Sequence, residues 1–331
     1  MKKLFILFTV ICLTLIGGCS GDNQADKKHS NNHLQKVSLM LDWYPNAVHS
    51  FLYAAQEKGY FKEQGLDVDI KMPADTNDPL RLVAAGKMDL AISYQPEIVI
   101  ARSENIPVKS IGAIVRHPLN TLLVPADGQV KSPSDLEGKM VGYPSIPLDE
   151  AIVHTMVKND GGNPQKVKMA DVGYNLIPAL AAKKTDGLIG GYINHEKLLL
   201  EKEGHKMRSF NPSDYGVPDY YELVLVASDK GLKERPGVYK KFMSAIKKGQ
   251  EFVQKQPDKG LSILLKHEEK TSPLEKDIET KSLNILLPLM DAKNKPFGYQ
   301  DPASWDRITK WLHDSKVIKT NVKASEAFEN I

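Results

Sequence analysis

The sequence predicts an α/β protein with two lobes, and three observations lead to this prediction. Short apolar runs alternate with amphipathic segments along most of the chain, as in strands followed by helices. About 300 residues follow an apolar amino end and a polar stretch, which is more than one hydrophobic core usually holds. A pattern of helix end, aspartate and apolar strand occurs twice, at 84–92 and at 181–189. We therefore expect two α/β lobes.

The first lobe is expected to begin over residues 35–127. Its strands are predicted at 37–41, 68–70, 90–93, 108–114 and 121–124, and its helices at 49–58, 79–85 and 96–102. The polar turn Ala126-Asp127-Gly128, followed by helix-start residues from Ser132, predicts a crossover to the other lobe.

The second lobe is expected over 128–222, and the strongly strand-like run 223–227 is expected to return the chain to the first lobe. Its strands are predicted at 140–142, 167–171 and 187–189, and its helices at 148–159 and 177–183. The remainder, 223–331, is mostly helical and should cover the first lobe, with helices at 236–256, 261–266, 273–286 and 302–313.

The amino end has the pattern of a secretory signal over 1–18. Two lysines precede an apolar run at 4–16, which is shorter than the roughly 20 residues of a membrane-spanning helix. Ile16-Gly17-Gly18-Cys19 resembles a bacterial lipoprotein processing box, which implies an acylated Cys19. Residues 19–34 are polar and predict a flexible tether. An ordinary cleaved signal with an incidental thiol is the alternative.

The composition excludes several classes of protein. The only cysteine besides Cys19 is Cys12, inside the signal, so disulfides, thiolate metal ligands and a cysteine nucleophile are excluded from the folded body. The nine histidines include no helical His-x-x-x-His pair, and no phosphate-loop or dinucleotide motif occurs, so we expect no metal and no cofactor. The net charge is +3, and the basic residues form no stripe along the sequence, so we expect no nucleic-acid partner.

The repeated pattern also predicts a ligand cleft. In open α/β sheets, ligands bind beyond the carboxyl ends of the strands. One repeat is followed there by Tyr94 and Gln95, and the other by Tyr192, Asn194 and Glu196. These two segments are therefore candidate walls of one cleft.

The most unusual stretch, Asp-Trp-Tyr-Pro-Asn-Ala-Val-His at 42–49, follows the first predicted strand. Together with Ala-Ala-Gln-Glu-Lys-Gly-Tyr-Phe at 54–61 and Gly-Tyr-Ile-Asn-His-Glu at 191–196, it resembles the NMT1/THI5-like periplasmic binding proteins, in the branch that binds thiamine pyrimidine precursors. The resemblance extends through Tyr-Tyr-Glu-Leu-Val-Leu at 220–225. It implies a type II periplasmic-binding-protein fold, with a two-crossover hinge and the ligand cleft between the lobes.

The resemblance also implies a function. The chain would be a solute-binding lipoprotein of an ABC importer, monomeric and lipid-anchored on the extracytoplasmic face of the cell membrane. It would carry a formylaminopyrimidine to the permease subunits and catalyse no reaction. Another flat heterocycle, such as hydroxymethylpyrimidine or thiamine, is an alternative ligand. A pyrimidine synthase is the alternative in another class, but those enzymes carry a cysteine-rich motif and act inside the cell.

A flat aminopyrimidine needs aromatic faces and polar partners. Trp43 and Tyr192 are the candidates for stacking on the two faces of the ring, and Glu196 for accepting hydrogen bonds from an amine. Further contacts are expected from Asn46, His49, Tyr94, Gln95, Asn194 and Tyr221. Structural alternatives remain open, because Trp43 and Tyr221 can pack in a core, His49 can cap a loop and Glu196 can favour a helix start.

Overall fold

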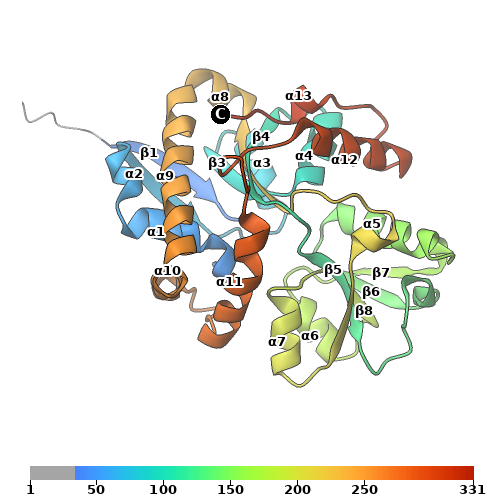
Figure 1. Ribbon diagram of the computed structural model, residues 1–331. Coiled ribbons are helices and arrows are strands. Elements are labelled where there is room, and N and C mark those ends of the chain that lie inside the picture. Colours follow the sequence, from blue (N-terminus) through green and yellow to red (C-terminus); the bar gives the residue numbers. More distant parts are fainter. Residues whose placement is uncertain (1–33) are drawn as a thin grey trace, which may run out of the picture. The chain divides into compact units, whose positions relative to one another are not determined.

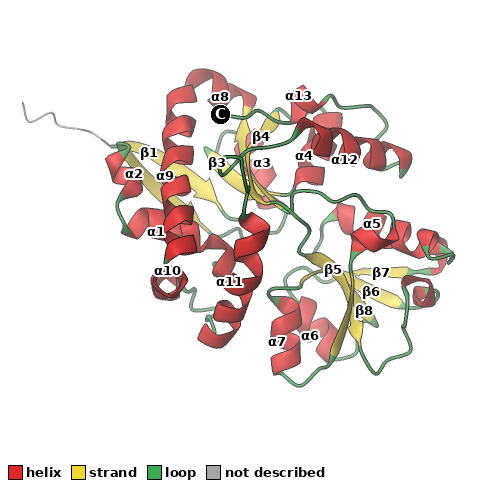
Figure 2. Ribbon diagram, in the orientation of Figure 1, coloured by secondary structure: helices red, strands yellow, loops and turns green. Residues whose placement is uncertain are grey.

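The structure is a computed structural model that describes residues 34–331 (Figure 1). The predicted signal over 1–18, the acylated Cys19 and all but the last residue of the predicted tether lie outside the described residues. Within 34–331, no helix is both long and apolar enough to cross a membrane. Two β-sheets with helices around them form this part of the chain (Figure 2).

The sheet of the first lobe has the strand order β2-β1-β3-β10-β4. Strand β1 pairs in parallel with β2 and β3, whereas β10 runs antiparallel between β3 and β4. The strands are β1 (Gln35–Met40), β2 (Leu66–Lys71), β3 (Leu90–Ser93), β4 (Val108–Val115) and β10 (Leu223–Ser228). The central strands β3 and β10 are almost entirely buried, as their continuous apolar runs predict.

The sheet of the second lobe has the order β7-β6-β8-β5-β9. Strands β6, β7 and β8 are parallel, and β5 runs antiparallel to both β8 and β9. The strands are β5 (Asn120–Pro125), β6 (Met140–Tyr143), β7 (Lys168–Asp171), β8 (Gly187–Tyr192) and β9 (Met207–Phe210). Strand β9 has the sequence Met-Arg-Ser-Phe, which was not predicted because it lacks an apolar run.

The helices pack around these sheets, and the longest, α9, lies over the first lobe (Figure 1). The helices before the second lobe are α1 (Ser50–Glu57), α2 (Tyr60–Glu63), α3 (Asp78–Ala84) and α4 (Gln95–Ser103), and those of the second lobe are α5 (Pro147–Asn159), α6 (Leu176–Ala181) and α7 (Glu196–Lys202). The carboxyl-terminal helices are α8 (Asp229–Glu234), α9 (Pro236–Lys255), α10 (Pro257–Leu264), α11 (Lys276–Met290), α12 (Pro302–Asp314) and α13 (Ala324–Ala327).

The first crossover lies earlier than the sequence predicted. The run 121–124, assigned to the first lobe, belongs to β5 in the second sheet, so the chain crosses between β4 and β5, before Asn120. The prediction at 126–128 was wrong because a buried apolar strand has the same pattern in either sheet. The chain returns between β9 and β10.

The two crossovers are bonded to each other. The carboxylate oxygen Oε2 of Glu222, just before β10, accepts hydrogen bonds from the backbone N–H groups of Leu119 (2.6 Å) and Asn120 (2.9 Å). On the surface, His117 Nδ1 lies 3.0 Å from Asp219 Oδ2. These contacts hold the two crossover segments, which together form the hinge, side by side.

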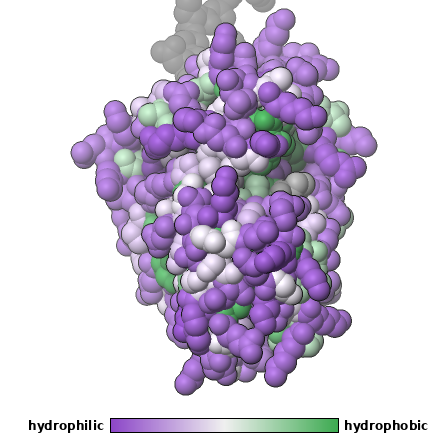
Figure 3. Space-filling model, turned by 90° about the vertical axis from the view of Figure 1, so that its right-hand side faces the viewer, coloured by the Kyte–Doolittle hydropathy of each residue, from purple (hydrophilic) through white to green (hydrophobic). Residues whose placement is uncertain are grey.

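The outer surface is mainly hydrophilic on the face shown in Figure 3, with hydrophobic residues scattered among polar ones. Among the described residues, Met72 is the one large hydrophobic side chain that counts as exposed. The large apolar side chains therefore lie mainly in the cores and in the pocket between the lobes.

Candidate ligand-binding site

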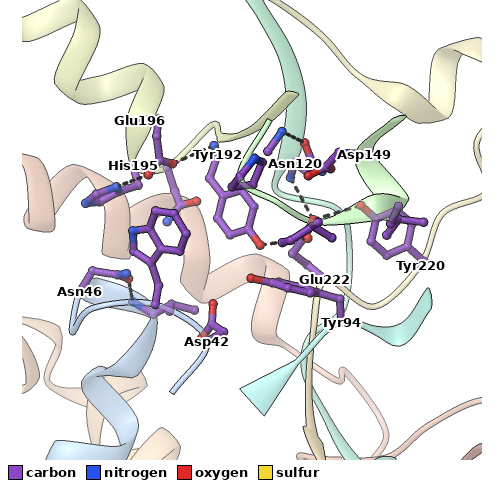
Figure 4. Close-up of a pocket in the computed structure, with 17 residues that line it drawn as sticks. Asp42, Asn46, Tyr94, Asn120, Asp149, Tyr192, His195, Glu196, Tyr220 and Glu222 are labelled. Atoms are coloured by element: carbon purple, nitrogen blue, oxygen red, sulfur yellow. Dashed lines mark hydrogen bonds and ion pairs between the residues drawn. The ribbon is translucent and has the colours of Figure 1, made fainter. Parts of the chain in front are cut away.

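A pocket between the two sheets collects residues from both lobes and from the hinge (Figure 4). Six of the predicted ligand residues line it: Trp43, Asn46, Tyr94, Tyr192, Asn194 and Glu196. The two segments that follow the repeated pattern thus contribute to the same pocket.

One aromatic side chain from each lobe packs against the apolar core of the other lobe. Trp43 follows β1 of the first lobe, yet it packs against the apolar cluster of the second lobe and lies 4.4 Å from the Tyr174 ring, between centroids. Tyr192, at the end of β8, packs against the large cluster of the first lobe. The buried Nε1 of Trp43 has no hydrogen-bond partner among residues 34–331. The indole N–H therefore remains available as a donor.

The loop after β1 is shaped by Asn46 and His49. The Asn46 side chain accepts from Val48 N at 3.1 Å and caps a short 3-10 turn, while the Asn46 N–H donates to His49 Nδ1 at 3.2 Å. Because Nδ1 accepts, the imidazole carries its proton on Nε2, which donates to Asp42 Oδ1 at 3.0 Å. His49 thereby orients Asp42, which lines the pocket.

Three predicted ligand residues do not line the pocket, and each has a supporting contact instead. His49 is fully buried in the loop just described. Gln95 is also fully buried, and its Oε1 accepts from Tyr221 N at 2.8 Å. The Tyr221 hydroxyl accepts from Asp301 N at 2.8 Å, and its ring packs against Arg116. Direct contact of these three residues with a ligand stays a prediction, because their side chains support neighbouring parts of the protein and do not line this pocket.

Glu196 has the geometry of a carboxylate held in place. Its Oε2 accepts from Tyr192 N at 2.9 Å, and its Oε1 lies 2.9 Å from His195 Nδ1. Burial opposes the charge, but His195 and the backbone donors hold the pKa of Glu196 below its usual value. Glu196 is therefore a charged acceptor at the pocket wall, even though it also begins α7.

A second polar group was not predicted: Asn120, Asp149 and Glu222 (Figure 4). Asn120 Nδ2 donates to Asp149 Oδ1 at 2.7 Å, and Tyr192 donates from its hydroxyl to Glu222 Oε1 at 3.1 Å. Burial raises the pKa of Asp149 to about 8 and that of Glu222 to about 7. The pocket therefore contains two carboxyl groups that bind a proton easily, beside the charged Glu196.

These three residues carried weak signals in the sequence. Asp149 is in the first turn of α5, where acidic residues are common. Asn120 and Glu222 each stand next to an apolar strand, and Glu222 is part of the Tyr-Tyr-Glu-Leu element that the resemblance already used. A polar residue at a crossover is the signal that would have found both.

The described residues offer no place for a metal ion, since no three His, Cys, Asp or Glu side chains gather there in a suitable arrangement. The polar groups of the pocket are instead directed at hydrogen bonds, and its walls contain the aromatic residues Trp43, Tyr94, Tyr192 and Tyr220. This arrangement suits a flat molecule that offers hydrogen-bond donors to the acidic side chains.

Comparison with known proteins agrees with the resemblance seen in the sequence. The family model described as "NMT1/THI5 like" matches residues 46–260, which is more than half of the chain. The chain belongs to the NMT1/THI5-like family. A family relative from Halalkalibacterium halodurans, named formylaminopyrimidine-binding protein, is 42% identical over 100% of this chain and 99% of its own length.

Enzymes of the family are less similar to this chain. A 4-amino-5-hydroxymethyl-2-methylpyrimidine phosphate synthase from Legionella pneumophila is 24% identical over 89% of this chain and 91% of its own length.

Among solved structures, an alkanesulfonate-binding protein from Xanthomonas axonopodis pv. citri matches with a TM-score of 0.69 and 11% identity, covering 89% of this chain and 98% of its own. The predicted type II periplasmic-binding-protein fold is thereby confirmed.

Proposed function

We propose that this protein is the solute-binding component of an ABC importer and carries a formylaminopyrimidine-type precursor of thiamine. The observation that carries the proposal is the pocket that Trp43 and Tyr192 build from opposite lobes. The family membership and the relative named formylaminopyrimidine-binding protein, similar over its full length, support the same ligand class.

The proposed binding mode is a ring held between the aromatic walls. Stacking a base on an aromatic side chain contributes about 1–3 kcal/mol, whereas micromolar affinity requires about 8 kcal/mol after the cost of association. Polar contacts must supply the rest. The charged Glu196 would accept from an exocyclic amine, and Asn46, Tyr94 and Asn194 line the same pocket.

Closure of the lobes would then present the loaded form to the permease. A ligand that contacts both lobes stabilises the closed arrangement by its differential affinity for that state. Support comes from the residues that reach from the second lobe into the first, such as Asn194, whose Nδ2 donates to Ser282 Oγ on α11.

The anchoring part of the proposal concerns Cys19. An acylated Cys19 would hold the protein on the extracytoplasmic face of the membrane, close to the permease. Replacing Cys19 by alanine should move the protein from the membrane fraction to the soluble fraction. An unchanged distribution, together with no acyl group on the wild-type amino end, would exclude the lipid anchor.

The ligand itself is tested by two measurements. Mass spectrometry of the small molecule released from purified protein should show a formylaminopyrimidine. Calorimetry should then rank that compound above hydroxymethylpyrimidine and thiamine, the alternative ligands. Tight binding of thiamine alone would replace the proposed ligand and keep the carrier function.

The enzyme alternative has its own test. Incubating the protein with pyridoxal phosphate and iron, followed by chromatography, should yield no new pyrimidine. The absence of cysteine from the body of the chain supports this expectation, because the synthases that resemble this fold carry a cysteine-rich motif.

A further inference from the structure

Asp149 is a pocket residue to which the proposed binding mode assigns no task. It stands in the first turn of α5, its side chain is 1% exposed, and it lines the same pocket as Trp43 and Tyr192. Its Oδ2 lies 3.2 Å from the position that a Cβ on Gly190 would occupy, and Gly190 lines the pocket as well. Asp149 therefore stands in the wall of this pocket, next to Gly190.

The neighbours of Asp149 fix which of its two oxygens is free. Gly190 N–H donates to Asn120 Oδ1 at 2.8 Å, and a backbone N–H can only donate. The Asn120 amide is thereby oriented, so that its Nδ2 group faces Asp149 and donates to Oδ1 at 2.7 Å. Oδ1 is an acceptor, and Oδ2 is the only oxygen of Asp149 that can hold a proton without losing this bond.

The surroundings of Asp149 favour a proton on its Oδ2 atom. Burial, and next to it the Glu222 and Glu97 carboxyl groups, raise the pKa of Asp149 to about 8, against the effect of the bond from Asn120. Oδ2 has no hydrogen-bond partner among the residues that the structure describes. A buried polar atom without a partner costs free energy, so an acceptor in the pocket would remove a penalty.

We propose that Asp149 determines ligand specificity by donating a hydrogen bond from Oδ2, as a neutral acid, to an unprotonated ring nitrogen of the ligand. This inference rests on the proposed function, because it concerns the same pocket and a heteroaromatic ring. Asp149 and Glu196 then have opposite roles: Glu196 accepts from an amine, and Asp149 donates to the ring. The pair selects rings that carry an amine and a free ring nitrogen.

The consequence is a class of rejected ligands. A ring in which the recognised nitrogen is replaced by C–H, or is alkylated and positively charged, leaves the Oδ2–H without an acceptor. Sites built to hydrogen-bond a group discriminate strongly against analogues that lack it, because their own buried polar group is left unpaired. Stacking on Trp43 and Tyr192 would be unaffected.

The first test needs only the wild-type protein. Calorimetry compares the formylaminopyrimidine with two analogues in which each ring nitrogen is replaced in turn by C–H. One of the analogues should bind at least tenfold more weakly. Equal affinity for all three compounds would overturn the proposal for Asp149 and leave the proposed function intact, whereas failure of every aminopyrimidine to bind would remove both.

Two variants test the residue itself. Asp149→Asn should stay within about threefold of the wild type, because its oxygen can keep the bond from Asn120 while its amide N–H donates to the ring. Asp149→Leu should lose at least tenfold and should no longer distinguish the analogues. The matched control is Glu150→Leu, the exposed neighbour on α5, which should change neither value.

The result of the asparagine variant separates the two protonation states. A carboxylate that accepts from the ligand amine would lose at least tenfold on Asp149→Asn, and this outcome would overturn the proposed role as a donor. Circular dichroism confirms that each variant is folded. If the leucine variant does not fold, the wild-type comparison and the asparagine variant still decide.

Discussion

Asn194 donates from its side-chain Nδ2 to the Ser282 hydroxyl at 3.0 Å, and this bond joins the loop after β8 to helix α11 of the other lobe. Both side chains are buried, at 1% and 0% exposed. The bond exists only while the lobes are together, so it contributes to the closed arrangement and not to either core.

Replacing Ser282 by alanine should therefore weaken ligand binding more than it weakens folding. A neutral hydrogen bond contributes about 0.5–1.5 kcal/mol, which corresponds to roughly 2- to 12-fold in affinity. Calorimetry measures the change, and small-angle scattering should show less compaction on adding ligand. Ser262→Ala, on an exposed part of α10, is the control. Unchanged affinity in Ser282→Ala would show that this bond does not favour closure.

The stacking residues should affect all flat ligands alike. Trp43→Ala and Tyr192→Ala should each cost about 1–3 kcal/mol, or roughly 5- to 150-fold in affinity, whatever the substituents on the ring. Tyr215→Ala, in the same lobe as Tyr192 but away from the pocket, should cost nothing in binding. Retention of full affinity by either pocket variant would exclude the sandwich.

Glu196 should act on one substituent only. Glu196→Gln removes the negative charge and places a donor against the ligand's amine, so the loss in affinity should be large for an aminopyrimidine. The loss should shrink markedly for an analogue without that amine. An equal loss for both compounds, measured by calorimetry, would reduce Glu196 to a helix-start residue.

His195 gives the fold a dependence on pH. Burial alone would lower the pKa of His195, but Glu196 and Glu279 outweigh this effect and raise it. A raised pKa means that the stabilisation is complete below the unfolded value of about 6.5 and is lost as the pH rises through the folded value. Urea unfolding at several pH values should show this loss in the wild type. His195→Gln should lack it, and the exposed His313→Gln should retain it.

Asp149 should also make the protein less stable as the pH rises, over a range that begins at a lower pH than the range for His195. Its pKa rises from about 4 in the unfolded chain to about 8 in the folded protein, so the folded state binds the proton more tightly. Stability should decrease as the pH rises from 4 through 8, and Asp149→Asn should flatten this part of the curve. The exposed Asp127→Asn is the control. A curve unchanged by Asp149→Asn would mean that Asp149 is ionised in the folded protein.

The sequence predicted those parts of the structure that depend on local pattern. Alternating apolar runs located nine of the ten strands found within 34–331, and the repeated segments led to Tyr94 and Tyr192 on one pocket. Strand β9 has no such pattern, and it forms because β5 offers a free edge. The position of the first crossover likewise depends on pairing between distant strands.

In the candidate site too, the residues with a local signal in the sequence were predicted, and those placed only by the fold were not. Trp43 and Glu196 were found because an aromatic and an acid stand out where a strand ends. Asp149 was not found, because its first-turn position is ordinary and only the fold places it beside Asn120. His49 and Gln95 were assigned to the ligand, but their contacts lie on the inner side of the loop and helix that carry them.

The Glu222 carboxyl group connects the hinge with the pocket through its two oxygens. One oxygen accepts from the backbone amides of Leu119 and Asn120, and the other accepts from the Tyr192 hydroxyl. The bond from the Tyr192 hydroxyl lowers the pKa of Glu222, so a ligand that redirects this hydroxyl should raise that pKa and weaken the two amide bonds. The exchange of the Leu119 and Asn120 amide protons with solvent deuterium should thus report pocket occupancy at the crossover itself.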